Sequence, residues 1–372
     1  MSLTLANAKS IVIRHKQIDS WFASKAHLNI YRGCAHNCAY CDGRYDGYHV
    51  EGDFGSDIVA RSNAPELLDR ALNPHRKRHP LNSGYLLLGG GVSDSYQPVE
   101  KKLELAARCL EVIYRWRQPV HILTKSSLVE RDLNLIAQIH QRRAALVSMS
   151  FSTVDDNVAR VMEPGCSPPS RRLETLSRFK SHNIPTGMFL LPVIPGVSDS
   201  EQHITQSVAA AADAGVSFIV FGGMTLKPGR QQTHFSRVMQ AHMADVLAHY
   251  PKIYRNDPFG AALPKYYQRI EARFARVARK YKISRRIPPH LFAPVCNRKD
   301  RMLVALDQLA YLQNACNDCH PFAALKKKLQ SQGDTLNLLE DSELSDSLRL
   351  LLNTMTDRQN HFPGEHWFQK YL

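Results

Sequence analysis

The sequence contains no apolar run long enough to cross a membrane, and its first residues, MSLTLANAKSIVIRHK, lack the apolar core of a signal peptide. It also contains no low-complexity tract and no internal repeat beyond the β-α units described below. These absences predict a cytoplasmic protein without a membrane partner, in which thiols stay reduced. Eight cysteines in that compartment favour metal binding or reactivity over disulfides.

Acidic residues are comparatively few, because 34 Asp and Glu stand against 48 Lys and Arg, giving a formal net charge of +14. This balance favours polyanionic partners, DNA or RNA first, although many basic enzymes have no such partner. With 372 residues, 44% of them hydrophobic, the chain can bury one large core or two modest ones. A single α/β barrel with an appendage fits this length as well as two equal domains do.

Short apolar runs alternate with helical patterns along the first two thirds of the chain. The runs are continuous, which is typical of parallel strands covered on both faces. The expected strands are 27–33, 84–90, 120–126, 145–153, 186–194 and 218–226. The expected helices are 65–73, one that begins just after Pro98, 128–142, 170–182 and 201–214. Six β-α units predict an α/β fold, a partial (β/α)6 TIM-like barrel, whose chemistry collects at the C-terminal ends of the strands.

We divide the chain into an N-terminal segment (1–24), the barrel (25–230) and a mainly helical C-terminal region (231–372). Within the last region, the segment LLEDSELSDSLRLLLNTMTD is expected to form a final acidic amphipathic helix that packs on the body.

A basic stripe is expected on an earlier helix of the C-terminal region. The segment RFARVARKYKISRR places Arg273, Arg276, Arg279 and Lys280 near helical spacing. A solvated helix face and a phosphate-binding surface are both compatible with this pattern.

The segment YRGCAHNCAYCDGRYDGYHV places Cys34, Cys38 and Cys41 within eight positions, with no fourth cysteine nearby. A structural zinc site usually assembles two pairs of ligands, which this C-x3-C-x2-C spacing does not match, although His36 or His49 could act as a fourth ligand. A cubane [4Fe-4S] cluster normally takes four thiolates. Three thiolates on one loop would hold three irons and leave the fourth iron open to a substrate or cofactor.

The loop Cys34-x3-Cys38-x-Tyr40-Cys41, placed directly after a first strand, resembles the signature of the radical S-adenosylmethionine (radical SAM) enzymes. The resemblance implies a [4Fe-4S] cluster on the three cysteines and S-adenosyl-L-methionine chelating the open iron. It implies that one electron, from a flavodoxin- or ferredoxin-type donor, cleaves the cofactor to a 5′-deoxyadenosyl radical that abstracts hydrogen from the substrate. Tyr40 belongs to this signature, and we expect it to have a cofactor-binding and a catalytic role.

The end of the second strand supplies further candidate cofactor ligands. In LLLGGGVSDSYQP, Gly89, Gly90 and Gly91 would let the backbone approach the methionyl group closely, although a plain tight turn explains them too. Ser93 and Asp94 follow. The Asp94 carboxylate could accept a hydrogen bond from the cofactor ammonium or cap the next helix.

The third and fourth strands supply the remaining candidates. Lys125 ends the third strand in ILTKSS and could pair with the cofactor carboxylate, the alternative being an ordinary surface lysine. Ser150 and Ser152 share one face of the fourth strand and are candidates for binding ribose hydroxyls. Glu163, in MEPG, is a weaker polar candidate.

The order of GGGVSDSYQPVEK, ILTKSS, SFSTVDDNVARVMEPG, FLLPVIPGVSD and FGGMTLKPG resembles the spore photoproduct lyase branch of DNA-repair, photolyase-like enzymes. That branch implies opening of a thymine dimer and return of a hydrogen atom by a cysteine thiol. This chain has Gly91 at the position of that cysteine, and Asp42 where the lyase has a second tyrosine. We therefore expect a relative with another substrate.

The other cysteines fall into two groups. Cys109 and Cys166 are expected to be inert packing or surface residues. Cys316 and Cys319, followed directly by a histidine and preceded by Cys296, could bind a second iron–sulfur cluster or zinc, or could remain unligated thiols.

Three functions compete. The leading one is a radical enzyme that acts on nucleic acid in a lyase- or repair-like reaction. The second keeps the radical chemistry but modifies a protein, a peptide or a small molecule. The third is a non-catalytic iron–sulfur sensor or scaffold, for which a cofactor pocket around Lys125 would be unnecessary.

Overall fold

The structure is a computed structural model. It describes residues 1–48, 50, 52–76, 80–89, 92–255, 257–312, 326–327 and 329–330. Several expectations fall outside these residues, namely those for His49, Gly90, Gly91, the 316–320 segment and the final acidic helix.

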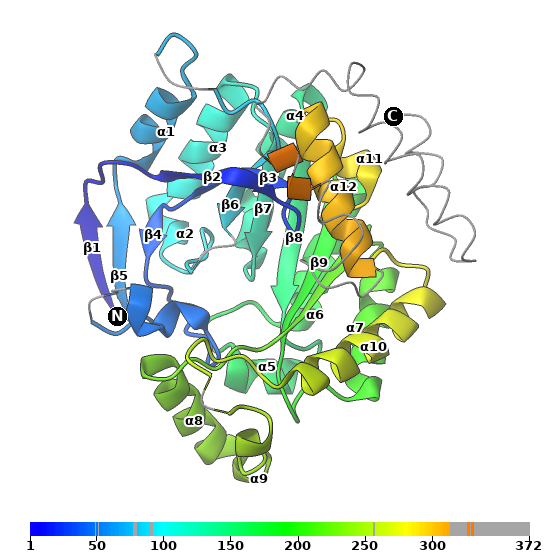
Figure 1. Cartoon of the computed structure of the whole chain (residues 1–372). Coiled ribbons are helices and arrows are strands. Elements are labelled where there is room, and N and C mark those ends of the chain that lie inside the picture. Colours follow the sequence, from blue (N-terminus) through cyan, green and yellow to red (C-terminus); the bar gives the residue numbers. More distant parts are fainter. Residues whose placement is uncertain are drawn as a thin grey trace, which may run out of the picture.

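The fold is built on a seven-stranded sheet with the order β10-β9-β8-β7-β6-β3-β2. Six of its strands run parallel to one another: β3 (Ser24–Leu28), β6 (Tyr85–Gly89), β7 (Val120–Thr124), β8 (Ala145–Phe151), β9 (Thr186–Val193) and β10 (Phe218–Gly223). The edge strand β2 (Val12–Asp19) is antiparallel to β3. Figure 1 shows the sheet curling with helices outside it. Since β2 and β10 form open edges, the predicted partial barrel is confirmed.

The first expected strand, 27–33, is wrong in its bounds. The chain leaves the barrel sheet after Leu28, where the Asn29 N–H donates to Ile11 O at 2.9 Å. Tyr31–Arg32 then form β4 of a second sheet, together with β5 (Asp57–Arg61) and β1 (Ser2–Ala6). This second sheet pairs segments far apart in sequence, and it holds the residues that immediately precede the cysteine loop.

The helices that cover the sheet match the predicted ones, with two exceptions. The first part of the expected helix 128–142 is a 3-10 helix, Ser127–Asp132, and the α-helix begins only at Leu133. The longer helices are α1 (Ala64–Leu72), α3 (Leu105–Arg115), α4 (Leu133–Arg142), α6 (Pro169–Ser181), α7 (Glu201–Asp213), α8 (Arg230–His242), α10 (Pro264–Lys280) and α12 (Arg298–Leu312). The helix after Pro98 is broken into α2 (Glu100–Leu103) and α3 by Glu104, which has a left-handed φ of 51°. The break lets the buried Glu100 carboxylate accept from the Ala106 N–H at 3.0 Å, so that it caps α3.

The C-terminal helices α11 (Pro289–Phe292) and α12 close one end of the barrel. Their apolar side chains, among them Phe292 and Leu303, pack with Tyr85 and Phe218 from the starts of strands β6 and β10. This packing leaves the opposite end, where the strands finish, for polar chemistry. Within the described residues, no helix has the length and apolar character that a membrane span requires.

Candidate active site

The cysteine loop lies between β4 and the short 3-10 helix η1 (Asp42–Arg44). Cys34 and Cys38 are buried and Cys41 is half-buried, and all three thiols are free. Backbone hydrogen bonds fix the loop: the Cys34 N–H donates to Phe54 O at 2.9 Å, and the Cys41 N–H donates to Cys38 O at 3.2 Å. The loop therefore has a defined shape.

The turn after α5 (Asp156–Met162) packs against the cysteine loop and holds it through backbone hydrogen bonds. The Ala39 N–H donates to Met162 O at 2.8 Å, and the Gly165 N–H donates to His36 O at 3.0 Å. A side chain at Gly165 would collide with the Ala35 carbonyl, so the close approach requires glycine. The next residue, Cys166, lies with its Sγ 3.6 Å from that of Cys38.

Burial controls the protonation of the three thiols. It raises the pKa of Cys34 and of Cys41 to about 12. The pKa of Cys38 is raised well above its usual range by the contact with Cys166 and by burial. Without a positive partner, thiolates are therefore disfavoured here, and metal ions would supply that charge.

The donor set fits a cluster better than a single ion. Among the described residues, no three His, Cys, Asp or Glu side chains converge on one metal ion. In a cubane cluster each thiolate binds a different iron, so three separated thiolates on one loop suit it. His36 Nδ1 lies 2.8 Å from Gly165 O, and its Nε2 lies 3.2 Å from Asp94 Oδ2 in an ion pair. This ion pair directs Nε2 to Asp94.

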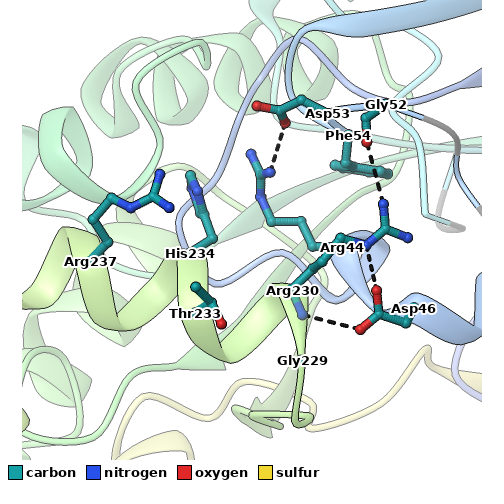
Figure 2. A pocket seen from close by; sticks show the side chains of 10 residues that line it. All are labelled: Arg44, Asp46, Gly52, Asp53, Phe54, Gly229, Arg230, Thr233, His234 and Arg237. Carbon is teal, nitrogen blue, oxygen red and sulfur yellow. Dashed lines mark hydrogen bonds and ion pairs between the residues drawn. The ribbon is translucent and has the colours of Figure 1, made fainter.

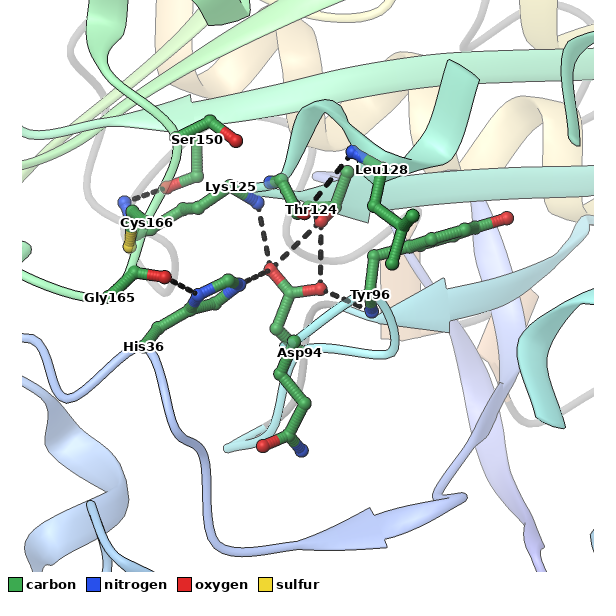
Figure 3. Close-up of polar contacts among 12 residues, drawn as sticks. His36, Asp94, Tyr96, Thr124, Lys125, Leu128, Ser150, Gly165 and Cys166 are labelled. Atoms are coloured by element: carbon green, nitrogen blue, oxygen red, sulfur yellow. Dashed lines mark hydrogen bonds and ion pairs between the residues drawn. The ribbon is translucent and has the colours of Figure 1, made fainter. Parts of the chain in front are cut away.

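Asp94 joins the cysteine loop to the ends of the strands, as Figure 3 shows. Its carboxylate accepts from Thr124 Oγ1 at 2.8 Å, from the Lys125 N–H at 2.7 Å and from the Tyr96 N–H at 2.8 Å, besides its ion pair with His36. Burial opposes ionisation, but His36 and these hydrogen bonds outweigh it and lower the pKa of Asp94. Asp94 is thus an ionised positioning residue, and its contact with a cofactor ammonium stays a prediction.

Glu163 is the second polar centre, although from the sequence we expected it to be only a weaker candidate. This fully buried carboxylate accepts from Tyr40 Oη and Ser152 Oγ, the latter at 2.8 Å, and pairs with Lys125 and Arg172. Burial would raise the pKa of Glu163, but the two cations outweigh it and hold that pKa well below the usual range. Two cations around one carboxylate leave a surplus positive charge.

Lys125, at the carboxyl end of β7, carries this surplus positive charge. Its Nζ lies 3.1 Å from Glu163 Oε1, 2.9 Å from Ser150 Oγ and 5.6 Å from the centre of the Tyr40 ring. Arg172 is completely buried, whereas the Lys125 side chain remains 13% exposed. Ser150, in β8, and Ser152, directly after its end, thus meet the same polar cluster, and their proposed contact with ribose stays a prediction.

The end of β6 packs closely against its surroundings. Gly89 has a φ of 97°, and a side chain there would collide with Leu123 O of β7. Ser93 Oγ donates to Gly33 O at 3.0 Å, next to the first cysteine. The fully buried Gln97 side chain accepts a hydrogen bond from the Ala35 N–H at 2.8 Å, a contact that no local sequence pattern predicts.

The sequence model of the radical SAM superfamily matches residues 28–208, the range that contains the three cysteines, Asp94 and Glu163. The chain belongs to the radical SAM superfamily. As a radical SAM protein it requires S-adenosyl-L-methionine, a [4Fe-4S] cluster and an external electron donor.

Relatives of this radical SAM protein occur in bacteria and archaea. The uncharacterized protein Rv2578c of Mycobacterium tuberculosis is 28% identical over 261 residues, which are 69% of this chain and 74% of that protein. The uncharacterized protein MJ0683 of Methanocaldococcus jannaschii is 28% identical over 213 residues, covering 57% and 75% of the two chains.

A solved structure shares the barrel. Spore photoproduct lyase complexed with dinucleoside spore photoproduct aligns with a TM-score of 0.54 at 14% identity, covering 75% of this chain and 79% of that chain. At this identity the likeness shows a shared fold, and it supports the partial barrel found here.

Proposed function

We propose that this radical SAM enzyme acts on nucleic acid in a lyase- or repair-like reaction and is not itself a spore photoproduct lyase. The observation that supports the radical mechanism is the position of the Cys34–Cys41 loop, which lies beside the Glu163 cluster at the open end of the barrel. S-adenosylmethionine on the cluster would supply a 5′-deoxyadenosyl radical for hydrogen abstraction.

The residues around Glu163 have distinct roles in this proposal. Cys34, Cys38 and Cys41 hold the cluster. Lys125 uses its surplus charge to bind the cofactor carboxylate, since Arg172 already neutralises Glu163 from the buried side. The hydrogen bond from Tyr40 Oη to Glu163 fixes the ring beside the last two cysteines.

Asp94 and the serines complete the binding site. Asp94, which accepts hydrogen bonds from three donors, keeps the end of β6 beside the cysteine loop, where Gly89 and Ser93 lie near the methionyl group. Ser150 and Ser152 are proposed to face the ribose. Gly90 and Gly91 keep the roles expected from the sequence.

Charge and fold support a nucleic-acid substrate. The chain carries a formal charge of +14. The basic stripe on α10 contributes less than expected, because Arg273 donates to Asp199 O at 2.8 Å and Arg276 pairs with Glu201. Arg279 and Lys280 remain exposed at the end of the helix. The shared fold with a lyase bound to a dinucleoside photoproduct adds support for the substrate class.

The test is substrate-dependent turnover by the anaerobically reconstituted, reduced enzyme. Single-stranded DNA, duplex DNA, RNA and a mixture of peptides and metabolites are offered separately, each in deuterated form, and 5′-deoxyadenosine is quantified. Nucleic acid should raise its yield above the substrate-free rate and transfer deuterium into it. Stimulation and transfer by the peptide and metabolite mixture alone would contradict the proposal.

A further inference from the structure

A cavity of about 520 Å³ lies beside the segment that follows the cysteine loop. Its walls come from Arg44, Asp46 and residues 52–54, which follow the loop, and from Gly229 and the first turns of α8, as Figure 2 shows. None of Asp94, Lys125 and Glu163 lines it, so it is separate from the proposed cofactor site. Its volume is within the range of small-molecule sites.

The charged side chains of this cavity do not balance. Arg230 pairs with Asp46 at 2.5 Å, and Arg44 pairs with Asp53 at 2.9 Å. Arg237 also lines the cavity, and among the described residues it makes neither a hydrogen bond nor an ion pair. Three arginines against two aspartates leave one positive charge in the cavity.

Arg44 offers an unused donor in the same wall. Its side chain is only 6% exposed, and both terminal nitrogens are occupied, Nη1 by Asp53 and Nη2 by Asn37. Its Nε is buried and has no partner in the described part of the chain. A buried donor without an acceptor costs free energy, and a ligand oxygen would remove that cost.

His234 lies between Arg237 and Arg44 in Figure 2. Burial and the positive charges of Arg44 and Arg237 lower the pKa of His234 to about 4. The ring is therefore neutral at pH 7. Its N–H would donate a hydrogen bond to an anion bound beside the arginines, since no carboxylate in the described part of the chain accepts from this ring.

We propose that this cavity binds a phosphate group, with Arg237, Arg44 Nε and His234 as its donors. The remaining space would accommodate the sugar or base attached to that phosphate. A free organic phosphate and a nucleic-acid strand present the same chemistry. Assigning the phosphate to a strand rests on the proposed function, whereas the phosphate site itself does not.

The position of the cavity connects a bound phosphate with the cluster loop. The backbone carbonyl of Phe54, a residue of the cavity wall, accepts a hydrogen bond from the Cys34 N–H. The Arg44 N–H donates to Cys41 O at 3.2 Å. The same two residues thus line the cavity and hold the backbone of two cluster cysteines. A phosphate here would contact residues that hydrogen-bond directly to the backbone of the cysteine loop.

The test is calorimetric titration of the cluster-loaded protein with inorganic phosphate, AMP and a 5′-phosphorylated oligonucleotide. Arg237→Gln is the test variant, because Arg237 is exposed and supports no described contact. Arg70→Gln, which removes an exposed arginine of α1, is the matched control. Iron content and thermal unfolding report whether each variant folds.

The expected result is saturable binding of AMP and phosphate that Arg237→Gln weakens about tenfold or more, as for a hydrogen bond between charged groups. Arg70→Gln should bind as the unmodified protein does. Absence of binding by all three probes, or equal binding by both variants, would overturn the phosphate site.

The oligonucleotide separates the two proposals. Binding of phosphate and AMP without any binding or turnover stimulation by nucleic acid would support the cavity and contradict the nucleic-acid function. Turnover stimulated by nucleic acid, with no phosphate binding that depends on Arg237, would leave the function standing and overturn the cavity proposal.

Discussion

The sulfur atoms of Cys38 and Cys166 lie 3.6 Å apart, although 128 residues separate them in the sequence. If Cys38 binds iron as a thiolate, the Cys166 thiol is the donor in this contact. Hydrogen bonds to ligand sulfurs stabilise the reduced, more negative cluster and so raise its reduction potential.

Cys166→Ala should therefore lower the reduction potential of the cluster while iron content stays at about four per chain. A redox titration followed by electron paramagnetic resonance measures this change. Cys109→Ala, in the core between α3 and the sheet, is the control and should leave the potential unchanged. Loss of the cluster in Cys166→Ala, or an unchanged potential, would contradict the donor role.

Lys125→Ala should weaken binding of S-adenosylmethionine about tenfold, because a charge-assisted contact with the cofactor carboxylate is lost. Cluster content should not change, since Lys125 Nζ bonds to Ser150 and Glu163 and not to a cluster cysteine within the described residues. Equilibrium dialysis under anaerobic conditions measures the affinity. The exposed Lys102→Ala is the matched control. Equal affinities of the two variants would exclude Lys125 as the carboxylate ligand.

Glu163→Gln should reduce the free energy of unfolding by about 3–5 kcal/mol, because it leaves the completely buried Arg172 without its carboxylate. Urea unfolding at pH 7 measures this loss. Glu201→Gln breaks the exposed pair with Arg276 and should cost only about 0–1 kcal/mol. Similar losses in both variants would show that the buried pair contributes no more than a surface pair.

The same carboxylate predicts a pH dependence. The pKa of Glu163 in the folded protein lies below its value in the unfolded chain, which is about 4.3. Its contribution is therefore fully present above that value and is lost as the pH falls through it towards the lower folded pKa. The stability difference between wild type and Glu163→Gln should shrink below about pH 4. A difference that grows with acidification would reverse the assigned sign.

The protein should not repair spore photoproduct efficiently. The sequence has Gly91 where the lyase family carries its hydrogen-donating cysteine, and Cys109 is completely buried among the apolar residues of α3. Offered the lesion, it should give at most slow turnover with aberrant adducts, and Gly91→Cys should improve thymine recovery. Chromatography of the products measures both. Clean multiple-turnover repair by the unmodified protein would restore the lyase interpretation.

The features that the sequence predicted are those with a local signature. Continuous apolar runs such as YLLLG mark strands buried on both faces, and the closely spaced cysteines mark the loop. The missed features depend on distant pairings. Glu163 meets Tyr40 across 123 residues. Glu100 accepts from Tyr31 and, across the helix break at Glu104, from the Ala106 N–H. No periodicity encodes such contacts, because they exist only once the strands are assembled.

The most direct measurement is reductive cleavage of S-adenosylmethionine by the anaerobically reconstituted protein, with dithionite as electron source and 5′-deoxyadenosine quantified by chromatography. The unmodified protein should bind about four irons and four sulfides at the cysteine loop and produce 5′-deoxyadenosine. The triple variant with Cys34, Cys38 and Cys41 replaced by Ala should lose both this cluster and the product. A full, cofactor-responsive cluster in the triple variant, or no 5′-deoxyadenosine from the loaded unmodified protein, would contradict the assignment.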